Sequence, residues 1–410
     1  MSSLLKRAQE VQIAQLTDRG VDVDDVRARL RSQVIETPSW GYANSGTRFG
    51  TFRQVGAASS IAEKLADAGQ VHKFTGVAPQ VALHTLWDLP DEAAVESVPA
   101  AAAEAGVRVG AINPNVFQDQ EYKLGSLCSP FADVRQRAID HCVYSVEIAG
   151  KVDSNVLSMW LADGTAFPGQ DNLVERKHRL LDSLRAIYER MPESMMMLVE
   201  YKLFEPAFYA TDLPDWGMSF LMCQKLGPQA KVLVDLGHHA QGVNIEQIVA
   251  NLIDEGMLGG FHFNNRKYAD DDLTVASINP YEFYLIYNEL VAAELGPNPP
   301  HIEYMIDQSH NIKGKIAEMI QTVMNIQTAY AKALLVDRAK LAAAQAEGDV
   351  QGGELCLVEA YETDVRPLLA LVREDLGLDP DPLGAFLASG YQQKVDAERA
   401  GRKAASTLGS

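Results

Sequence analysis

The sequence predicts an α/β fold, a (β/α)8 TIM barrel with a C-terminal α-helical extension. Eight short apolar runs alternate with segments of helical periodicity. The alternation runs from about residue 36 to about residue 335, slightly longer than the roughly 250 residues usual for this fold. Polar residues also fall where the predicted strands end. A doubly wound open sheet is the alternative, but no GxGxxG motif follows the first strand, which lowers its dinucleotide-binding version.

The eight predicted strands are short runs rich in apolar residues. They are Glu36–Trp40, Val81–His84, Val107–Asn113, Asn155–Trp160, Met195–Lys202, Lys231–Asp235, Gly260–Phe263 and Ile302–Asp307. The predicted helices between them are Ser60–Ala68, Asp91–Ala105, Asp133–Ala149, Asp171–Arg190, Asn244–Glu255, Pro280–Leu295 and Lys315–Ala331. Strand, helix and strand in regular succession are typical of parallel sheets with crossover helices.

Three segments are expected. Residues 1–35 form an N-terminal helical segment, residues 36–335 form the barrel and catalytic domain, and residues 336–410 form the helical extension. After Leu335 the composition changes to alanine and charged residues, with an apolar stripe on the predicted helices. A barrel is complete without this extension, so it either packs beneath the barrel or wraps a neighbouring subunit.

Composition restricts the class of protein. A chain of 410 residues, 47% of them hydrophobic, can bury a large core. Its 36 basic and 55 acidic residues give a net charge of −19, which argues against nucleic-acid and membrane partners. The four cysteines show no CxxC spacing, so neither a zinc knuckle nor a disulfide framework is indicated. Without an apolar signal segment or a membrane-spanning stretch, we expect a cytoplasmic protein.

Polar residues recur at the carboxyl ends of the predicted strands. In barrel enzymes these ends surround one mouth, where the chemistry takes place. The residues are His84, Asn113, Trp160, Glu200, Asp235, His262 and Asp307. Seven such residues from seven strands are difficult to explain as surface decoration, so we expect them to converge on one cavity.

Two motifs join an acid to a second polar group. The apolar run Met195–Val199 ends in Glu200-x-Lys202, and the two-residue period of a strand places both side chains on one face. A buried ion pair between them with only a structural role is an equal alternative. The second motif is Asp235-x-x-His238, in which Gly237 permits a tight bend, so that His238 can share or flank a cation with Asp235. His239 is expected to be a bystander.

The segment after His262 is acidic. A polar loop supplies Asp270, Asp271 and Asp272, of which Asp270 and Asp272 can point the same way. Carboxylates bind hard divalent cations, and an imidazole shifts the preference from Mg²⁺ or Ca²⁺ toward Mn²⁺, Co²⁺ or Zn²⁺. The alternative for the acidic run is a solvated turn. Asp307 ends the last strand, with a helix N-cap as its alternative.

Two further strand ends carry rings. His84 is a candidate base, with Asp88 near enough in sequence to orient it, or else a hydrogen-bonded core histidine. Trp160 offers an apolar wall of the kind that stacks on a sugar ring, although a lone tryptophan is more often part of the core. Jointly the residues indicate a site with two cations, a lysine, a histidine and an aromatic wall.

This set of residues resembles the two-metal ketol isomerases with xylose isomerase-like barrels. The surrounding segments Gly41–Phe49, Gly260–Asn264 and Ile306–His310 resemble L-rhamnose isomerase of the broad-specificity bacterial type. The resemblance covers about residues 36–335, and both the order and the spacing of the motifs agree. His262 stands where xylose isomerases use a carboxylate, so their metal preference does not transfer.

The resemblance implies a ligand set and roles for the other residues. One metal would be held by Glu200, Asp235, His262 and Asp307, and a second by His238, Asp270 and Asp272, with Asp235 bridging the two. Lys202 would meet a substrate oxygen, His84 would assist ring opening, and Trp160 would line the pocket. Phe49 would close a neighbouring subunit's site. Because such isomerases are tetramers, we expect a homotetramer and favour the intersubunit role for the extension.

The expected activity is aldose–ketose isomerisation, L-rhamnose to L-rhamnulose, with D-allose among possible further substrates. Two divalent cations, Mn²⁺ first and Co²⁺, Mg²⁺ or Zn²⁺ as alternatives, would polarise both substrate oxygens, and no organic cofactor is required. Asp307 or a hydroxide would take the O2 proton, Lys202 would stabilise charge at O1, and a hydride would shift between C1 and C2. An enediol route by proton abstraction is the alternative. A related barrel isomerase or epimerase, a metallohydrolase for phosphodiesters and a non-catalytic sugar-binding barrel remain open.

Overall fold

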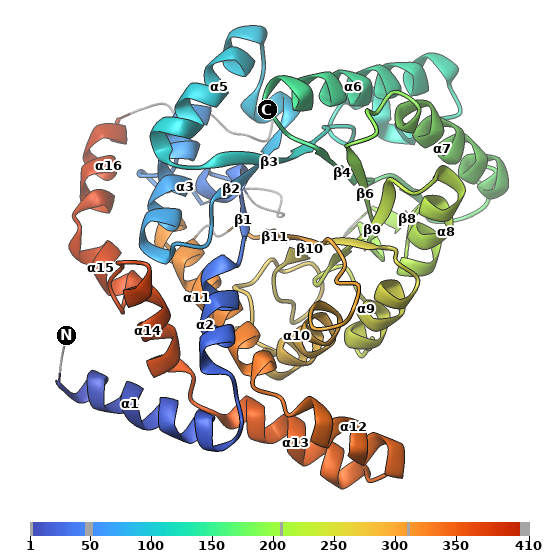
Figure 1. Ribbon diagram of the computed structural model, residues 1–410. Helices are drawn as coiled ribbons and strands as arrows, with labels where there is room; N and C mark the ends of the chain where they lie inside the picture. Colours follow the sequence, from blue (N-terminus) through green and yellow to red (C-terminus); the bar gives the residue numbers. More distant parts are fainter. Residues whose placement is uncertain (1–2, 46–51, 206–207, 310–311, 402–410) are drawn as a thin grey trace.

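A closed barrel of eight parallel strands forms the centre of the computed structural model, which describes residues 3–45, 52–205, 208–309 and 312–401 (Figure 1). Each strand pairs with its neighbours in chain order, and the last pairs with the first. The strands are β1 (Glu36–Pro38), β2 (Gln80–His84), β3 (Arg108–Asn113), β4 (Val156–Trp160), β6 (Met196–Glu200), β9 (Ala230–Asp235), β10 (Leu258–Phe263) and β11 (Glu303–Ile306). The predicted barrel is thereby confirmed.

Helices surround the barrel. The outer layer contains α3 (Ile61–Thr75), α5 (Glu92–Ala105), α6 (Ala132–Lys151), α7 (Leu173–Tyr188), α8 (Trp216–Leu226), α9 (Ile245–Asp254), α10 (Pro280–Glu294) and α11 (Lys315–Leu334). Side-chain caps begin several of them: Ser60, Asp91, Asn172 and Asn244 each accept a hydrogen bond from a first-turn N–H. Because the helices cover the barrel, the strands are buried on both faces and read as continuous apolar runs.

The register of neighbouring strands places the predicted site residues at one level. Trp160 pairs with Glu200 across β4 and β6, and His262 pairs with Asp235 across β10 and β9. His84 is likewise opposite Asn113. The last residues of these strands therefore surround the same end of the barrel.

The structure differs from the sequence prediction in several places. The predicted strand Met195–Lys202 ends at Glu200, so Lys202 lies in the following loop. The loops after β4 and β6 form a small antiparallel sheet of β5 (Gly164–Thr165), β8 (Tyr209–Thr211) and β7 (Phe204–Glu205). Helix α8 was also not expected, because its short sequence has little amphipathic contrast. The remaining short elements are α4 (Thr85–Asp88), η1 (Ser39–Tyr42) and η2 (Gln120–Leu124).

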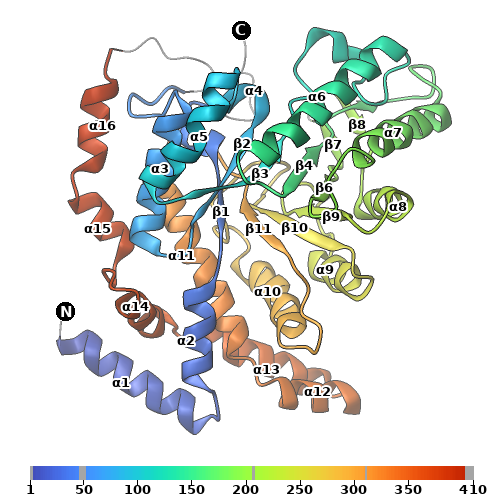
Figure 2. The same cartoon turned by 45° about the horizontal axis from the view of Figure 1, so that its top comes forward.

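The chain ends add helices along one flank of the barrel (Figure 2). They are α1 (Ser3–Asp18), α2 (Val23–Ser32), α12 (Arg338–Glu347), α13 (Val350–Glu362), α14 (Arg366–Asp375), α15 (Pro382–Ala388) and α16 (Tyr391–Arg399). Arg27 of α2 bonds Asp375 of α14 at 2.7 Å, and Arg399 of α16 bonds buried Asp67 of α3 at 2.8 Å. The extension thus packs on its own barrel's outer helices, and its role between subunits stays a prediction.

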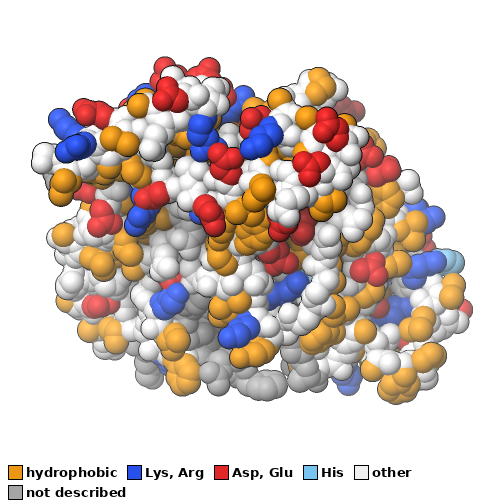
Figure 3. Space-filling view, turned by 90° about the horizontal axis from the view of Figure 1, so that it is seen from below, with side chains coloured by type: hydrophobic (Ala, Val, Ile, Leu, Met, Phe, Trp, Pro, Cys, Tyr) orange, Lys and Arg blue, Asp and Glu red, His pale blue; other side chains and the backbone are white. Residues whose placement is uncertain are grey.

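Charged side chains of both signs are interspersed on the face shown in Figure 3. Within the described residues, no helix combines the length and the apolar composition that a bilayer span needs.

Candidate active site

Four predicted ligands meet at the carboxyl end of the barrel. Glu200, Asp235, His262 and Asp307 each place one ligand atom within 4.8 Å of the others. His262 Nδ1 lies 3.2 Å from Glu200 Oε1, 3.6 Å from Asp307 Oδ2 and 3.8 Å from Asp235 Oδ2. A cation about 2.1 Å from each ligand separates them by up to about 4.2 Å, so the spacing fits one cation among them.

A second group lies beside the first and shares Asp235 with it. Asp235, His238 and Asp270 also bring ligand atoms within 4.8 Å of one another. His238 Nε2 lies 3.4 Å from Asp270 Oδ1 and 3.9 Å from Asp235 Oδ2. Gly237 makes this approach possible, because a Cβ there would lie 3.2 Å from Asp235 Oδ1 and 3.3 Å from Asp270 Oδ1. Asp235 is therefore placed to bridge two cations.

The three aspartates of the acidic loop have different surroundings. Asp271 is the turn residue, because its Oδ2 accepts hydrogen bonds from the N–H groups of Lys267 and Tyr268 at 2.6 Å. The Asp270 side chain is instead 8% exposed and Asp272 is buried, and the expectation that both point the same way stays a prediction. Asp272 has a left-handed backbone with a φ of 46°, and it lies outside both ligand groups described above. Burial raises the pKa of the Asp272 carboxyl, and the negative charge of Asp270 raises it further.

The chemistry of these donors fits divalent cations. Glu200 Oε2 and Asp270 Oδ1 are buried without a hydrogen-bond partner among the described residues. Burial raises the pKa of Asp235 and of Asp307, and neighbouring carboxylates raise both further. Buried carboxylates thus repel one another here, and lone pairs lack donors. Bound cations would relieve both conditions.

Lys202 faces this centre from the loop after β6. Its Nζ lies 2.8 Å from Asp270 Oδ2 and 2.8 Å from Glu205 Oε2. Glu200, which a structural ion pair would have joined to Lys202, instead contacts His238 and His262 through Oε1. Burial lowers the pKa of Lys202, but Asp270 and Glu205 outweigh it and hold that pKa above its ordinary value. The lysine is therefore a cation at neutral pH.

A group of aromatic rings lies beside the acidic centre. His84 lies 4.1 Å from Trp87 and 4.7 Å from Trp40 between ring centroids, and Phe117 lies 4.6 Å from Trp160. Lys202 Nζ sits 5.2 Å from the centroid of Trp160, which joins this wall to the acidic centre. Burial lowers the pKa of His84 to about 3, so its imidazole is neutral, and its Nδ1 has no hydrogen-bond partner among the described residues.

The structure bears on two expectations from the sequence: that Asp88 orients His84, and that Asp307 could instead be a helix N-cap. Asp88 accepts a hydrogen bond from the backbone N–H of His84 at 2.8 Å, so it fixes the backbone at His84. Asp307 does not cap a helix, because Gly314 occupies the N-cap position of α11. Its Oδ1 accepts from Trp40 Nε1 at 2.8 Å. Phe49, the predicted contact to a neighbouring subunit, lies outside the described residues.

Sequence reasoning missed several members of the site. Trp40 holds Asp307, Glu205 pairs with Lys202, and Phe117 connects His84 to Trp160. Asn264 donates to both oxygens of Asp235, at 3.0 and 3.1 Å. Asn264 could have been found, because it follows His262 by one strand period. Phe117 lies in a loop and Glu205 in the short strand β7, and no periodicity predicts the path of either segment.

Relatives and a family model match this chain. The model described as L-rhamnose isomerase matches residues 99–370. A probable sugar isomerase of Rhizobium meliloti is 43% identical over 394 residues, covering 94% of this chain and 90% of the relative. A probable sugar isomerase of Mesorhizobium japonicum is 41% identical over 393 residues, with the same coverage.

Solved structures support the fold. An L-ribulose 3-epimerase has a TM-score of 0.56 at 12% identity, covering 74% of this chain and 98% of its own. The 3-keto-D-glucoside 4-epimerase YcjR from E. coli has a TM-score of 0.53 at 13% identity, covering 72% of this chain and 100% of its own. At these identities the likeness concerns the barrel alone. The family match and the two sugar isomerase relatives show that this chain belongs to the L-rhamnose isomerase family and is a sugar isomerase.

Proposed function

We propose that the protein is a metal-dependent aldose–ketose isomerase that converts L-rhamnose to L-rhamnulose and accepts other aldoses such as D-allose. The observation that carries this proposal is the pair of ligand groups sharing Asp235, with the Lys202 ammonium and an aromatic wall beside them. Two divalent cations, Mn²⁺ by preference, would polarise the substrate oxygens at C1 and C2 when bound. Glu200, Asp235, His262 and Asp307 would hold one, and His238, Asp270 and Asp272 would complete the other with Asp235.

Three side chains then have separate roles in proton transfer and charge stabilisation. His84 is neutral, and its buried Nδ1 has no hydrogen-bond partner in the described part of the chain, so it can exchange a proton with the ring oxygen and assist ring opening. Asp307 is held by Trp40, and its raised pKa suits a group that accepts the O2 proton. Lys202 stays protonated and stabilises negative charge as it develops at O1.

Hydrogen transfer completes the reaction. The hydrogen on C2 moves to C1 with its electron pair, while Asp307 accepts the O2 proton and that proton is then delivered to O1, so that no proton is gained or lost overall. The aromatic side chains and the buried strand ends keep bulk water from the reacting carbons. The alternative enediol route needs a base at C1 or C2, and Asp307 is the candidate for it.

Further parts of the proposal concern the assembly. We place the protein in the cytoplasm as a homotetramer in which Phe49 of one chain closes the site of a neighbour and the C-terminal helices contribute to the interface. Light scattering of the purified protein tests the tetramer. A Phe49→Ala variant that remains tetrameric should show a raised KM if Phe49 contacts substrate across the interface.

One experiment separates the function from its alternatives. Chelated protein is reloaded with Mn²⁺ and given L-rhamnose, D-allose and, in parallel, bis(p-nitrophenyl) phosphate. We expect ketose formation and no phosphodiester hydrolysis. Hydrolysis without ketose would favour a metallohydrolase, and sugar binding without turnover would favour a binding protein. L-Rhamnose deuterated at C2 should keep its label at C1 under a hydride shift and lose it to solvent through an enediol.

A further inference from the structure

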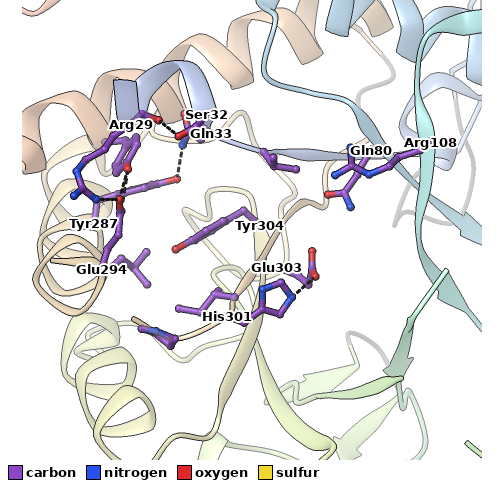
Figure 4. A pocket seen from close by; sticks show the side chains of 15 residues that line it. Arg29, Ser32, Gln33, Gln80, Arg108, Tyr287, Glu294, His301, Glu303 and Tyr304 are labelled. Atoms are coloured by element: carbon purple, nitrogen blue, oxygen red, sulfur yellow. Dashed lines mark hydrogen bonds and ion pairs between the residues drawn. The ribbon is translucent and has the colours of Figure 1, made fainter. Parts of the chain in front are cut away.

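A second cavity lies at the other end of the barrel. It has a volume of about 380 Å³ and is bordered by the first residues of β2, β3 and β11, by the carboxyl end of α2 and by α10 and α11 (Figure 4). On β11, Glu303 lines this cavity, and Asp307, just beyond the strand, belongs to the metal centre. Four residues of strand span about 13 Å, so the two places are separated by the layered barrel interior.

Polar groups around this cavity lack partners. The Gln33 carbonyl oxygen Oε1 is buried without a hydrogen bond from any described residue, while the amide of the same side chain donates to the Tyr287 hydroxyl at 3.4 Å. The Tyr304 hydroxyl and the Gln80 amide also make no hydrogen bond with any residue of the described ranges. In Figure 4 Tyr304 lies in the middle of the cavity, between Gln33 on one side and Gln80 on the other. A buried acceptor without a donor costs free energy that a bound hydroxyl would recover.

The charges around the cavity balance. Arg29 Nη1 pairs with Glu294 Oε1 at 2.6 Å, and that carboxylate also accepts from the Tyr330 hydroxyl at 2.8 Å. His301 pairs with Glu303 at 2.9 Å. Arg108 stands at the exposed rim. An anion entering here would meet the carboxylates of Glu294 and Glu303 as well as Arg108, so a neutral ligand is favoured.

Aromatic walls and size narrow the ligand further. The rings of Tyr287 and Tyr304 are stacked 6.5 Å apart, and Tyr330 lies 5.7 Å from Tyr287. Aromatic faces with a few amide and hydroxyl groups are typical of small-molecule sites, whose cavities measure roughly 300–1,000 Å³. We infer that this cavity is a second ligand site, separate from the metal centre, for a neutral polyhydroxylated ring of monosaccharide size.

Equilibrium dialysis tests the inference on the metal-loaded, full-length protein. With radiolabelled D-allose as the probe, we expect two bound sugars per chain. Gln33→Leu removes the buried acceptor and should weaken one of the two sites by about tenfold, because a sugar hydroxyl is then left unpaired, while kcat stays unchanged. Gln345→Leu, the same change at an exposed glutamine of α12, should leave both sites intact.

A second variant and crystals soaked in sugar test the same site independently. Val34→Phe fills the mouth of the cavity from a half-exposed position, so it should remove the same site even if Gln33→Leu folds poorly. Crystals soaked in D-allose should show the sugar against Gln33 and Tyr304. One bound sugar in the parent protein would overturn the inference, as would two sites in folded Val34→Phe. Sugar seen in the crystal while dialysis finds one site would mean binding at crystal concentration only, and it too would overturn it.

Discussion

Replacing Lys202 by methionine removes a buried cation while keeping most of its volume. The lysine is 4% exposed, and its Nζ lies 2.8 Å from Asp270. Two unit charges 4 Å apart in a protein site of effective dielectric 20 interact by about 4 kcal/mol. If a substrate oxygen gains charge at that distance only in the transition state, most of this energy appears in kcat. We therefore expect Lys202→Met to lower kcat by about 10² or more, which corresponds to about 2.7 kcal/mol.

The structure also predicts a side effect on the metal. Without Lys202, the carboxylates of Asp270 and Glu205 face each other, so the metal at His238 and Asp270 should bind with altered affinity. Metal stoichiometry and kcat must therefore be measured on the same preparation at saturating metal. Lys225→Met, at an exposed lysine of α8, is the matched control and should behave like the parent. A fully metallated Lys202→Met protein within about threefold of the parent kcat would refute the reasoning, because that is under about 1 kcal/mol.

Three further predictions concern the metals and the barrel floor. Chelation should abolish turnover, and Mn²⁺ or Co²⁺ should restore it better than Mg²⁺, because imidazoles sit among the carboxylates; full activity in a protein shown to be metal-free by atomic absorption would contradict this. Asp235→Ala should lower metal stoichiometry and kcat more than Asp272→Ala, because Asp235 belongs to both groups; equal losses would argue against a bridging role. Burial raises the pKa of Glu36 to about 8 from 4.5, so the folded chain keeps a proton that the unfolded chain releases. Stability should then fall as pH rises from about 5 to 8, by up to about 1.4 kcal/mol per unit. Glu36→Gln, which still accepts from Ala111 N–H, should flatten that fall in urea midpoints, and parallel pH profiles would speak against it.

The barrel could be predicted because its periodicity is strong at every strand. A parallel strand buried on both faces needs an apolar run, and the run then stops at a polar residue that faces the mouth. Val232–Asp235 shows this clearly: three apolar residues are followed by an acid that is fully buried. The same logic found Glu200, His262 and Asp307, because ligand chemistry requires those residue types at strand ends.

Loop geometry could not be predicted in the same way. Period two places Lys202 on the face of Glu200 only while the strand continues, and β6 stops at Glu200. Lys202 therefore finds Asp270 and Glu205, one from a loop that follows a strand two places away and one from the small antiparallel sheet. The periodicity of the sequence does not predict these two contacts, because loop paths depend on tertiary packing. Trp40 was missed for a related reason, since η1 turns its indole toward Asp307.

The two ends of the barrel show why one site was visible in the sequence and the other was not. At the carboxyl end, function requires carboxylates and imidazoles next to apolar strands, which is an unusual combination and easily noticed. At the amino end, the cavity is lined by tyrosines, glutamines and arginines that are ordinary at strand starts and helix ends. What distinguishes them is that Gln33 has a buried acceptor without a donor among the described residues, and this follows only from how the end of α2 meets Tyr287 of α10. A site for a neutral ligand therefore has to be found through unsatisfied hydrogen bonds, because it carries no concentration of charge to mark it.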